Sequence, residues 1–467
     1  MKFETINPAT GNVLRVYETM SRDAVFDIAQ ACHAAFLKWR DLDVRERGPY
    51  LRRLADVLRK NTERYARLIT SEMGKPITES RAEIEKCALA AEVFADRGPE
   101  WLRDESLEAD GKMHVVSYEP LGVVLSVMPW NFPFWQALRF AIPTILAGNV
   151  SILKHSNTVP ECALAIEEAF GEAGFPENTF RAVIADHATV EELVSSDVVQ
   201  GVSLTGSTET GMKIGETAGK SLKKVVMELG GSDPFIVLDD ANIDLAAKSA
   251  ASARAQNTGQ SCIAAKRFIV MEGVAGEFAQ AFAGYMSQLV VGDPMEEETQ
   301  VGPLVNAAAA DDMQALVQDA LDKGAKLVTG GKRVEGNGYF VEPTLLTGVG
   351  PDMRVVAEES FCPVAPIIVV KDEEEAISVA NDSEFGLGGS VWTKDLEKGM
   401  RVARRIEAGT LFVNAITKSD PRMPFGGIKK SGLGRELSKF GIREFVNVKA
   451  LNVYEQATDS GPHKGGE

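Results

Sequence analysis

One cysteine of this sequence lies where its side chain could face a cleft. Cys262 ends the polar, glycine-containing stretch 256–262, which follows a segment with helical character. A cysteine thiolate in such a place can act as a nucleophile. The alternative is a small buried hydrophobic residue, the ordinary role of a lone cysteine in a cytosolic protein. The other cysteines are assigned that role: Cys32, Cys87, Cys162 and, in a Phe-Cys-Pro turn with no base near it in sequence, Cys362.

A carboxyl group with the makings of a general base stands at Glu228. It ends an apolar run and precedes Leu229-Gly230-Gly231. Partial burial raises the pKa of a carboxyl group and makes it a usable base near neutral pH. The alternative is a residue at a turn or helix end, so the interpretation depends on a partner.

An amide, an aromatic ring and a guanidinium follow the apolar run 122–128. If Pro133 begins a helix, Trp135 and Arg139 share one face and Asn131 lies in the loop just before it. Arg139 is surrounded by apolar residues and therefore needs an anion, for which a carboxylate is the best geometric match. Core packing of Trp135 and a structural salt bridge of Arg139 are the alternatives.

A glycine-containing turn, residues 205–211, follows a predicted strand and opens a helix. Free N–H groups and the dipole of a helix N-terminus favour a pyrophosphate there. The stretch is neither the G-x-G-x-x-G fingerprint nor a P-loop, and an ordinary capped turn is the alternative.

Alternating strands and helices position these residues. The first hundred residues are predicted to be helical, with Ser21 capping the first helix, and the helices span 22–40, 43–70 and 78–102. Apolar runs then alternate with helices, which predicts parallel strands at 122–128, 150–153, 180–184 and 201–204, and a second series at 234–238, 268–271, 365–370 and 410–413. The expected intervening helices are 160–173, 189–195, 244–255 and 307–323, with a hairpin at 109–120 and an isolated strand at 445–454.

The composition indicates a globular protein of about three domains of roughly 150 residues each. Apolar residues make up 45% and charged residues 25% of the 467, and 50 Lys+Arg against 67 Asp+Glu give a net charge of −17. That charge disfavours nucleic acid and anionic membranes as partners. The charged N-terminus lacks an export signal, and the uncharged run 120–138 is interrupted by prolines and Asn131, so no membrane span is expected. Five scattered cysteines suggest neither a metal site nor disulfides, and a reducing cytoplasm fits.

Taken together, these motifs resemble the NAD(P)-dependent aldehyde dehydrogenases over nearly the whole chain. The likeness begins at Asn7-Pro8-Ala9-Thr10-Gly11 and ends at Val446. The motifs that carry it, in the order of the family, are Pro129-Trp130-Asn131-Phe132-Pro133, Leu153-Lys154, Gly206-Ser207-Thr208, Glu228-Leu229-Gly230-Gly231, Gly259-Gln260-Ser261-Cys262, Glu359-Ser360-Phe361-Cys362-Pro363 and Pro424-Phe425-Gly426-Gly427 with the following Ile428-Lys429-Lys430-Ser431-Gly432.

The resemblance implies a role for each of these residues. Cys262 is the expected nucleophile, Asn131 and the N–H of Cys262 stabilise the oxyanion, and Glu228 activates the water that releases the acid. Water is favoured over coenzyme A because members that use coenzyme A generally lack this base. The implied cofactor-binding residues are Trp130, Lys154, Ser156, Asn157, Gly206, Ser207, Glu359 and Phe361.

Two departures from the family pattern are informative. Asn157 replaces a glutamate that many NAD-using relatives carry. An amide does not repel a 2′-phosphate, so NADP is favoured over NAD, with Lys154 and Ser156 near the phosphate. Cys362 replaces a glycine and could alter the turn that aims Glu359.

For the substrate, the chain is similar to bacterial succinate-semialdehyde dehydrogenases. That likeness implies that Arg139 and Ser419 bind the distal carboxylate of succinate semialdehyde and that Trp135 packs against the aliphatic part of this substrate. The alternatives are a dehydrogenase of broader specificity for aliphatic or glutarate-type semialdehydes, and a non-catalytic structural or cofactor-binding protein of the same fold.

The implied architecture is α/β: a Rossmann-like cofactor domain, an α/β catalytic domain and a small β oligomerisation element. We expect the cofactor domain at 1–108 and 121–230, the catalytic domain at 231–440, and the oligomerisation element at 109–120 and 441–467. Unpaired strand edges in that element favour self-association as a dimer or tetramer. The tail from Gln456 is expected to be loosely held.

Overall fold

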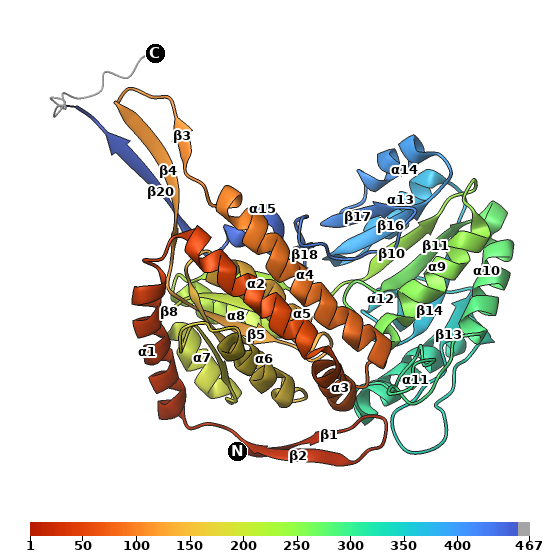
Figure 1. Cartoon of the computed structure of the whole chain (residues 1–467). Helices are drawn as coiled ribbons and strands as arrows, with labels where there is room; N and C mark the ends of the chain where they lie inside the picture. The colour runs from red at the N-terminus through yellow and green to blue at the C-terminus, as the bar shows by residue number, and fades with distance from the viewer. Residues whose placement is uncertain (456–467) are drawn as a thin grey trace.

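The four strands of the first predicted series belong to a six-stranded sheet in the computed structural model, which describes residues 1–455 (Figure 1). The other two strands of this sheet, Lys224–Glu228 and Gly432–Leu433, were not predicted. Its order is β19-β9-β8-β5-β6-β7, and all neighbours run parallel except β19. The strands are β5 (Val123–Met128), β6 (Val150–His155), β7 (Phe180–Val183), β8 (Val199–Thr205), β9 (Lys224–Glu228) and β19 (Gly432–Leu433). They are buried on both faces, as a parallel sheet covered by helices requires.

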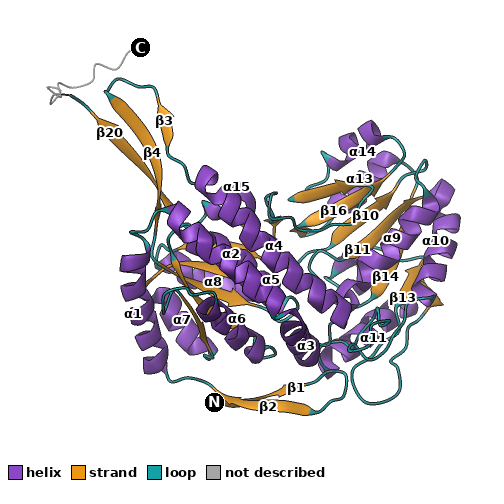
Figure 2. Cartoon of the chain, in the orientation of Figure 1, coloured by secondary structure: helices purple, strands orange, loops and turns teal. Residues whose placement is uncertain are grey.

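Eight helices surround this sheet (Figure 2). They are α1 (Arg22–Trp39), α2 (Val44–Lys60), α3 (Thr62–Met73), α4 (Ile77–Trp101), α5 (Pro133–Leu146), α6 (Pro160–Glu172), α7 (His187–Ser195) and α8 (Thr208–Lys220). Ser21 caps α1 as expected, because its hydroxyl accepts a hydrogen bond from the N–H of Ala24. The single helix expected at 43–70 is wrong: the chain leaves helical geometry at Asn61, whose side-chain amide donates to the carbonyl of Val57.

A hairpin near the N-terminus was not expected. β1 (Lys2–Ile6) and β2 (Val13–Glu18) pair antiparallel within the stretch predicted to be helical. The turn is made by Asn7, whose carbonyl accepts from Gly11, a residue with φ of +72°. The hairpin runs along the outside of both lobes (Figure 1).

The four strands of the second predicted series belong to a seven-stranded sheet of order β12-β13-β14-β11-β10-β16-β17, in which β12, β13 and β16 were not predicted. Its strands are β10 (Asp233–Val237), β11 (Ala265–Met271), β12 (Lys326–Thr329), β13 (Thr344–Thr347), β14 (Val364–Val370), β16 (Gly388–Trp392) and β17 (Thr410–Val413). The helices of this lobe are α9 (Ile243–Ala255), the 3₁₀ turn η1 (Gln256–Gly259), α10 (Glu272–Ser287), α11 (Ala307–Asp322), α12 (Arg354–Ala357), α13 (Glu373–Asn381) and α14 (Leu396–Ala403).

A three-stranded arm stands away from both lobes (Figure 2). β20 (Val446–Val453) pairs antiparallel with β4 (Met113–Pro120), which pairs with β3 (Glu105–Leu107). The strand expected to be isolated at 445–454 therefore joins the hairpin expected at 109–120.

The last elements return to the first lobe. β19 and α15 (Ser438–Ile442) contact β9, α4 and α5, although both fall in the range 231–440 predicted for the second domain. A short pair, β15 (Phe385–Gly386) with β18 (Ile428–Lys429), precedes them. The tail from Gln456 lies outside the described residues. Within residues 1–455, none of the helices is both long and apolar enough to cross a membrane.

Candidate active site

Most of the predicted site residues meet at one edge of the six-stranded sheet. Met128 lies opposite His155 and Thr205 lies opposite Glu228, so β5, β6, β8 and β9 end at the same level. The segments that follow β5 and β8 carry Asn131 and Ser207, and Lys154 lies next to the last residue of β6. Ligands of open α/β sheets bind at the carboxyl ends of the strands, so this edge is the expected place for a cofactor.

The nucleophile candidate follows a backbone that only tight packing can hold. Asn257, Thr258 and Gly259 all have positive φ, of 51°, 57° and 77°. Such conformations cost of order 1–3 kcal/mol for a residue with a side chain and are typical of functional sites. A Cβ on Gly259 would lie 2.6 Å from the carbonyl carbon of Cys362, so this position requires glycine.

Neighbouring groups fix this loop. Arg254 donates to the carbonyl of Gly259 at 2.7 Å, and Glu79 accepts from the N–H of Asn257 at 2.8 Å. Lys266 donates to the carbonyl of Cys262 at 2.7 Å. The backbone of the loop is thereby held from three elements, and the side chain of Cys262 remains partly exposed.

The amide of Asn131 is held in one orientation. Its Nδ2 donates to the carbonyl of Gln260 at 3.0 Å, and its Oδ1 accepts from Nε2 of Gln136 at 3.0 Å. The side chain of Asn257 donates to the Asn131 carbonyl at 2.8 Å, which joins the two loops. An amide nitrogen has two hydrogens, so one N–H of Asn131 remains for a ligand. The sequence analysis did not identify Gln136 as a site residue, because it lies in a mostly apolar helix whose residues are all buried.

A cavity of about 230 Å³ brings these groups together. Of the predicted residues, it is lined by the nucleophile and oxyanion candidates Cys262 and Asn131 and by five predicted cofactor residues. The full lining is Pro129, Trp130, Asn131, Gln136, Thr205, Gly206, Ser207, Gly230, Cys262, Glu359 and Phe361. The rings of Trp130 and Phe361 meet edge to face at its wall.

The walls of this cavity fit a dinucleotide. Ser207 caps α8, whose N-terminus opens at the carboxyl end of β8, and a Cβ on Gly206 would meet no atom within 4 Å. A Cβ on Gly230 would lie 2.5 Å from Oε2 of Glu359, so glycine is needed beside that carboxylate. Glu359 lines the cavity despite the Cys362 departure, and its Oε1 accepts from the N–H of Gly231 at 2.9 Å.

Three further predicted cofactor residues lie at the end of β6, outside this cavity. Lys154 is buried, which lowers the pKa of its ammonium group, and Asn157 is exposed. The hydroxyl of Ser156 donates to Thr158 at 3.1 Å. Between them, His155 is buried and spans from β6 to the carbonyl of Pro133, and burial lowers its pKa to about 4.

Burial governs the thiol of Cys262. It raises the pKa of Cys262 to about 12, while Lys266 and Arg139 act in the opposite direction. The thiol is therefore protonated at neutral pH in the chain alone, and a nucleophilic thiolate needs a base or a further positive charge.

Glu228 and Arg139 belong to one buried cluster. Both carboxylate oxygens of Glu228 are buried and have no hydrogen-bond partner within residues 1–455. Burial and the negative charge of Glu436 raise the pKa of Glu228 well above its ordinary value, and Arg139 lowers it. Arg139 is itself buried and forms an ion pair with Glu436, and its guanidinium lies 4.8 Å from the ring centre of Phe425.

The predicted substrate residues Trp135 and Ser419 meet at Lys86, which the sequence did not single out. The ammonium of Lys86 lies 4.3 Å from the ring centre of Trp135 and donates to the hydroxyl of Ser419 at 2.7 Å. Lys86 comes from α4, Trp135 from α5 and Ser419 from the loop after β17. The structure therefore brings Trp135 and Ser419 together at Lys86, whereas Arg139 is paired with Glu436.

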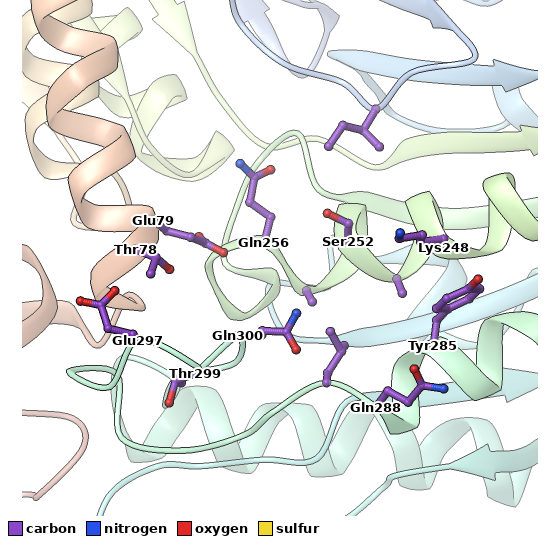
Figure 3. Close-up of a pocket in the computed structure, with 14 residues that line it drawn as sticks. Thr78, Glu79, Lys248, Ser252, Gln256, Tyr285, Gln288, Glu297, Thr299 and Gln300 are labelled. Atoms are coloured by element: carbon purple, nitrogen blue, oxygen red, sulfur yellow. The ribbon is translucent and has the colours of Figure 1, made fainter.

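A second cavity, of about 690 Å³, lies on the outer side of the loop (Figure 3). Glu79 and Gln256 face one another across it, with Lys248 and Tyr285 at its far end. Burial raises the pKa of Glu79 to about 7, and Lys75 opposes this shift. None of the predicted site residues lines this cavity.

Comparison with known proteins agrees with this geometry. A probable succinate-semialdehyde dehydrogenase [NADP(+)] of Synechocystis is 47% identical over 454 residues, which cover 97% of this chain and 99% of that protein. A succinate semialdehyde dehydrogenase [NAD(P)+] of Escherichia coli is 43% identical over 96% of this chain and 97% of its own length.

Solved structures match the fold throughout. The succinic semialdehyde dehydrogenase of Streptococcus pyogenes in complex with NADP+ has a TM-score of 0.95 and 39% identity, covering 97% of this chain and 100% of that one. The fold expected from the sequence is thereby confirmed. The model of the aldehyde dehydrogenase family matches residues 1–451, and the chain belongs to this family.

Proposed function

We propose that the chain oxidises succinate semialdehyde to succinate, with NADP or NAD as hydride acceptor. The observation that carries the proposal is one cavity lined by Cys262, by the free amide N–H of Asn131 and by the dinucleotide-binding edge of the sheet. The relatives named above are succinate-semialdehyde dehydrogenases, two of them named with NADP and one with either cofactor.

The residues divide the reaction into two stages. The thiol of Cys262 gives its proton to a solvent water molecule and its thiolate attacks the aldehyde carbon, while the N–H groups of Asn131 and Cys262 stabilise the oxyanion of the thiohemiacetal. A bound nicotinamide cofactor would accept the hydride from this carbon, held beside Glu359, Phe361 and Ser207. The thioester left on Cys262 is then attacked by water, whose proton goes to Glu228, and the acid and the thiol separate.

Glu228→Gln tests the second stage. Acylation does not need this base, but attack by water does, so we expect a burst of reduced cofactor of about one equivalent per active site followed by slow turnover. Stopped-flow absorbance of the reduced cofactor measures both phases. Undiminished steady-state turnover would contradict the role of Glu228.

Release of the acid by water, without coenzyme A, follows from the same residue. Glu228 lies at the carboxyl end of β9, and both of its carboxylate oxygens are buried without a hydrogen-bond partner within residues 1–455. Adding coenzyme A is therefore expected to leave the rate unchanged.

NADP is the favoured cofactor. Asn157 is exposed at the end of β6 where many NAD-using relatives carry a glutamate, so no carboxylate there repels a 2′-phosphate. Lys154 and Ser156 lie beside it. Titration of NADP and NAD under matched conditions gives the ratio of kcat/KM values, and a higher value for NAD would overturn the preference.

Two other functions are distinguished by simple assays. A dehydrogenase of broader specificity would turn over uncharged and glutarate-type aldehydes as well, which a chain-length series measures. A non-catalytic protein would form no reduced cofactor at any aldehyde concentration.

We also propose self-association through the arm, and a cytoplasmic location. β20 and β3 are the two edges of the arm, and Val448, Leu451 and Leu107 are exposed on them. Such edges are covered in stable proteins, and a second copy of the chain offers the edge strand β17 of its seven-stranded sheet. The net charge of −17 gives no reason to expect nucleic acid as a partner.

A further inference from the structure

A lysine and an arginine interrupt the buried strand β11, whose other residues are apolar. Lys266 is 1% exposed and Arg267 is 2% exposed, in a strand that lies between β10 and β14. Burying a positive charge is unfavourable unless neighbouring groups compensate it. Arg267 donates to the carbonyls of Ser232, Val379 and Ala380, none of which belongs to the predicted site. Its role is therefore to join β11 to its surroundings.

Lys266 is directed at the loop that carries the nucleophile candidate. Its ammonium group donates to the carbonyls of Ser261 at 2.9 Å, Cys262 at 2.7 Å and Ala264 at 3.4 Å. An ammonium group has three N–H donors, whereas a neutral amine has two, so three carbonyl acceptors fit the charged form. The loop is therefore built around a buried positive charge.

A carboxylate at the wall of the active-site cavity balances part of this charge. Oε1 of Glu359 lies 3.6 Å from Nζ of Lys266, and Glu359 lines the cavity that also contains Cys262. Burial lowers the pKa of Lys266, and the charge of Arg254 acts in the same direction, whereas Glu359, Asp233 and Cys262 oppose this shift. Lys266 thus lies between the predicted nucleophile and a predicted cofactor residue.

The carbonyl of Ser261 belongs to the same peptide unit as the N–H of Cys262. A trans peptide is planar, and its C=O and N–H groups point in opposite directions. The Ser261 carbonyl accepts from Lys266 and also from the N–H of Ala264 at 3.2 Å, so both of its lone pairs are used. The plane of this peptide is therefore fixed from its oxygen side. At the other side, the N–H of Cys262 donates to no atom of residues 1–455.

A positive charge on the oxygen of a peptide also makes its N–H a stronger donor, because hydrogen bonds in series polarise one another. In the reaction proposed above, this N–H stabilises the oxyanion of the thiohemiacetal. We propose, on the basis of that function, that Lys266 is a positioning residue: by binding the Ser261 carbonyl it directs the N–H of Cys262 toward the oxyanion and strengthens that hydrogen bond.

The same charge acts on the thiol of Cys262, and a test has to separate the two effects. Burial raises the pKa of Cys262 to about 12; Lys266 and Arg139 lower it, and Glu359 and Asp233 add to the rise. Alkylation of Cys262 by iodoacetamide needs the thiolate but forms no oxyanion, whereas oxidation of an aldehyde needs both. The other cysteines are buried, so the reagent reports on Cys262.

Lys266→Gln removes the charge and keeps an amide donor. Alkylation at pH 8 without cofactor is expected to slow about 3- to 30-fold, since a rise of about 1–3 in the pKa is half offset by the greater nucleophilicity of the thiolate. Single-turnover oxidation, with enzyme and NADP in excess over aldehyde, is expected to slow about 10-fold more than alkylation. The extra loss should be equal for succinate semialdehyde and butanal, because both form the same oxyanion. Lys266→Arg keeps the charge and should recover most of both rates.

Lys323→Gln is the matched control. Lys323 follows α11 in the same lobe, pairs with Asp319 and donates to the carbonyl of Asp352, but it is partly exposed. Both of its rates should match those of the unmodified enzyme. Equal losses in alkylation and oxidation for Lys266→Gln, or no loss, would overturn the role of Lys266. If the unmodified enzyme reduces no cofactor with any aldehyde, the proposed function itself fails.

A measurement on the unmodified chain does not depend on how a variant folds. Cysteine follows serine once in the sequence, at Ser261-Cys262, so ¹³C in serine carbonyls and ¹⁵N in cysteine amides mark this peptide alone in a correlation spectrum. Iodoacetamide first blocks the thiol, so that only Lys266 titrates beside the peptide. Because burial lowers the pKa of Lys266, we expect both signals to move together between pH 7 and about 10.5. Signals that stay constant over this range would overturn the inference.

Discussion

Three buried ionisable groups, Glu228, Glu436 and Arg139, act on one another through their charges. Two of them are acids and one is a base, so a single guanidinium serves two carboxyl groups. Burial raises the pKa of both acids, and Arg139 opposes that shift in each. The protonation of Glu228 therefore depends on a residue that need not touch the substrate.

Replacing Arg139 by methionine should move the pH dependence of the enzyme. Glu228 works as a base only when it is deprotonated. Without Arg139, its pKa rises further, so the water-dependent step should need a more alkaline pH, by about 1–3 units. The measurement is kcat against pH for succinate semialdehyde and butanal.

Because Glu228 is the proposed base for both aldehydes, both profiles should move together. The sequence alone suggested a loss confined to the carboxylated aldehyde, and the ion pair with Glu436 is the reason for the different expectation. An unchanged profile for both aldehydes would contradict the coupling, and a rise in KM for succinate semialdehyde alone would assign the carboxylate to Arg139.

At the scale of elements, the beginning of α4 holds α5 in place. Glu83 accepts hydrogen bonds from the N–H groups of Phe134 and Trp135, both at 2.9 Å, and so caps the N-terminus of α5. Lys75 is fully buried, pairs with Glu83 and lies 3.6 Å from the ring centre of Phe132. The loop that carries Asn131 is thereby anchored just after the oxyanion donor.

Lys75→Met should be strongly destabilising. It leaves the buried carboxylate of Glu83 without its counter-ion, which costs about 3–5 kcal/mol of unfolding free energy. Arg64→Met removes an exposed partner of Glu168 and should cost about 0–1 kcal/mol. Urea unfolding of both variants measures the difference, and similar costs would show that the Lys75–Glu83 pair contributes little.

The sequence predicted most accurately the helices and strands whose bounds are marked by apolar periodicity and by capping residues. The strand β17 and the helices α1 and α9 were placed to within about one residue, because apolar periodicity and caps such as Ser21 mark them. The β1–β2 hairpin was missed, since its strands are largely exposed and lack an alternating apolar face.

The sequence predicted those site residues that each lie in a recognisable motif of their own. Cys262, Asn131 and Glu359 each stand in a recognisable stretch, and the structure places all three at one cavity. Lys86 and Glu436 were not predicted as site residues, because the groups that they contact are far away in the sequence. Nothing within α4 distinguishes Lys86 from a solvated lysine.

For the whole molecule, the arm is the part that a single chain leaves uncovered. Leu451 and Val453 lie on one face of β20 and are 42% and 40% exposed. Replacing both by lysine should place charges in the contact between copies and shift the protein to a smaller assembly, which light scattering after size exclusion measures.

Val328→Lys provides the control for that variant. Val328 is 44% exposed on the edge strand β12, so it adds a similar charge on a different edge. Its assembly should match that of the unmodified chain. An unchanged mass for the arm variant would show that the copies associate elsewhere.

The return of β19 and α15 to the first lobe affects how the protein is made. Glu436, the partner of Arg139, and Phe445, whose carbonyl accepts from Asn149, both come from the last part of the chain. While the ribosome is still extending the polypeptide, the guanidinium of Arg139 has no counter-ion and β9 keeps an open edge. The first lobe therefore completes its folding only after nearly all of the chain has emerged, and a truncated product lacks the environment that sets the acidity of Glu228, the proposed catalytic base.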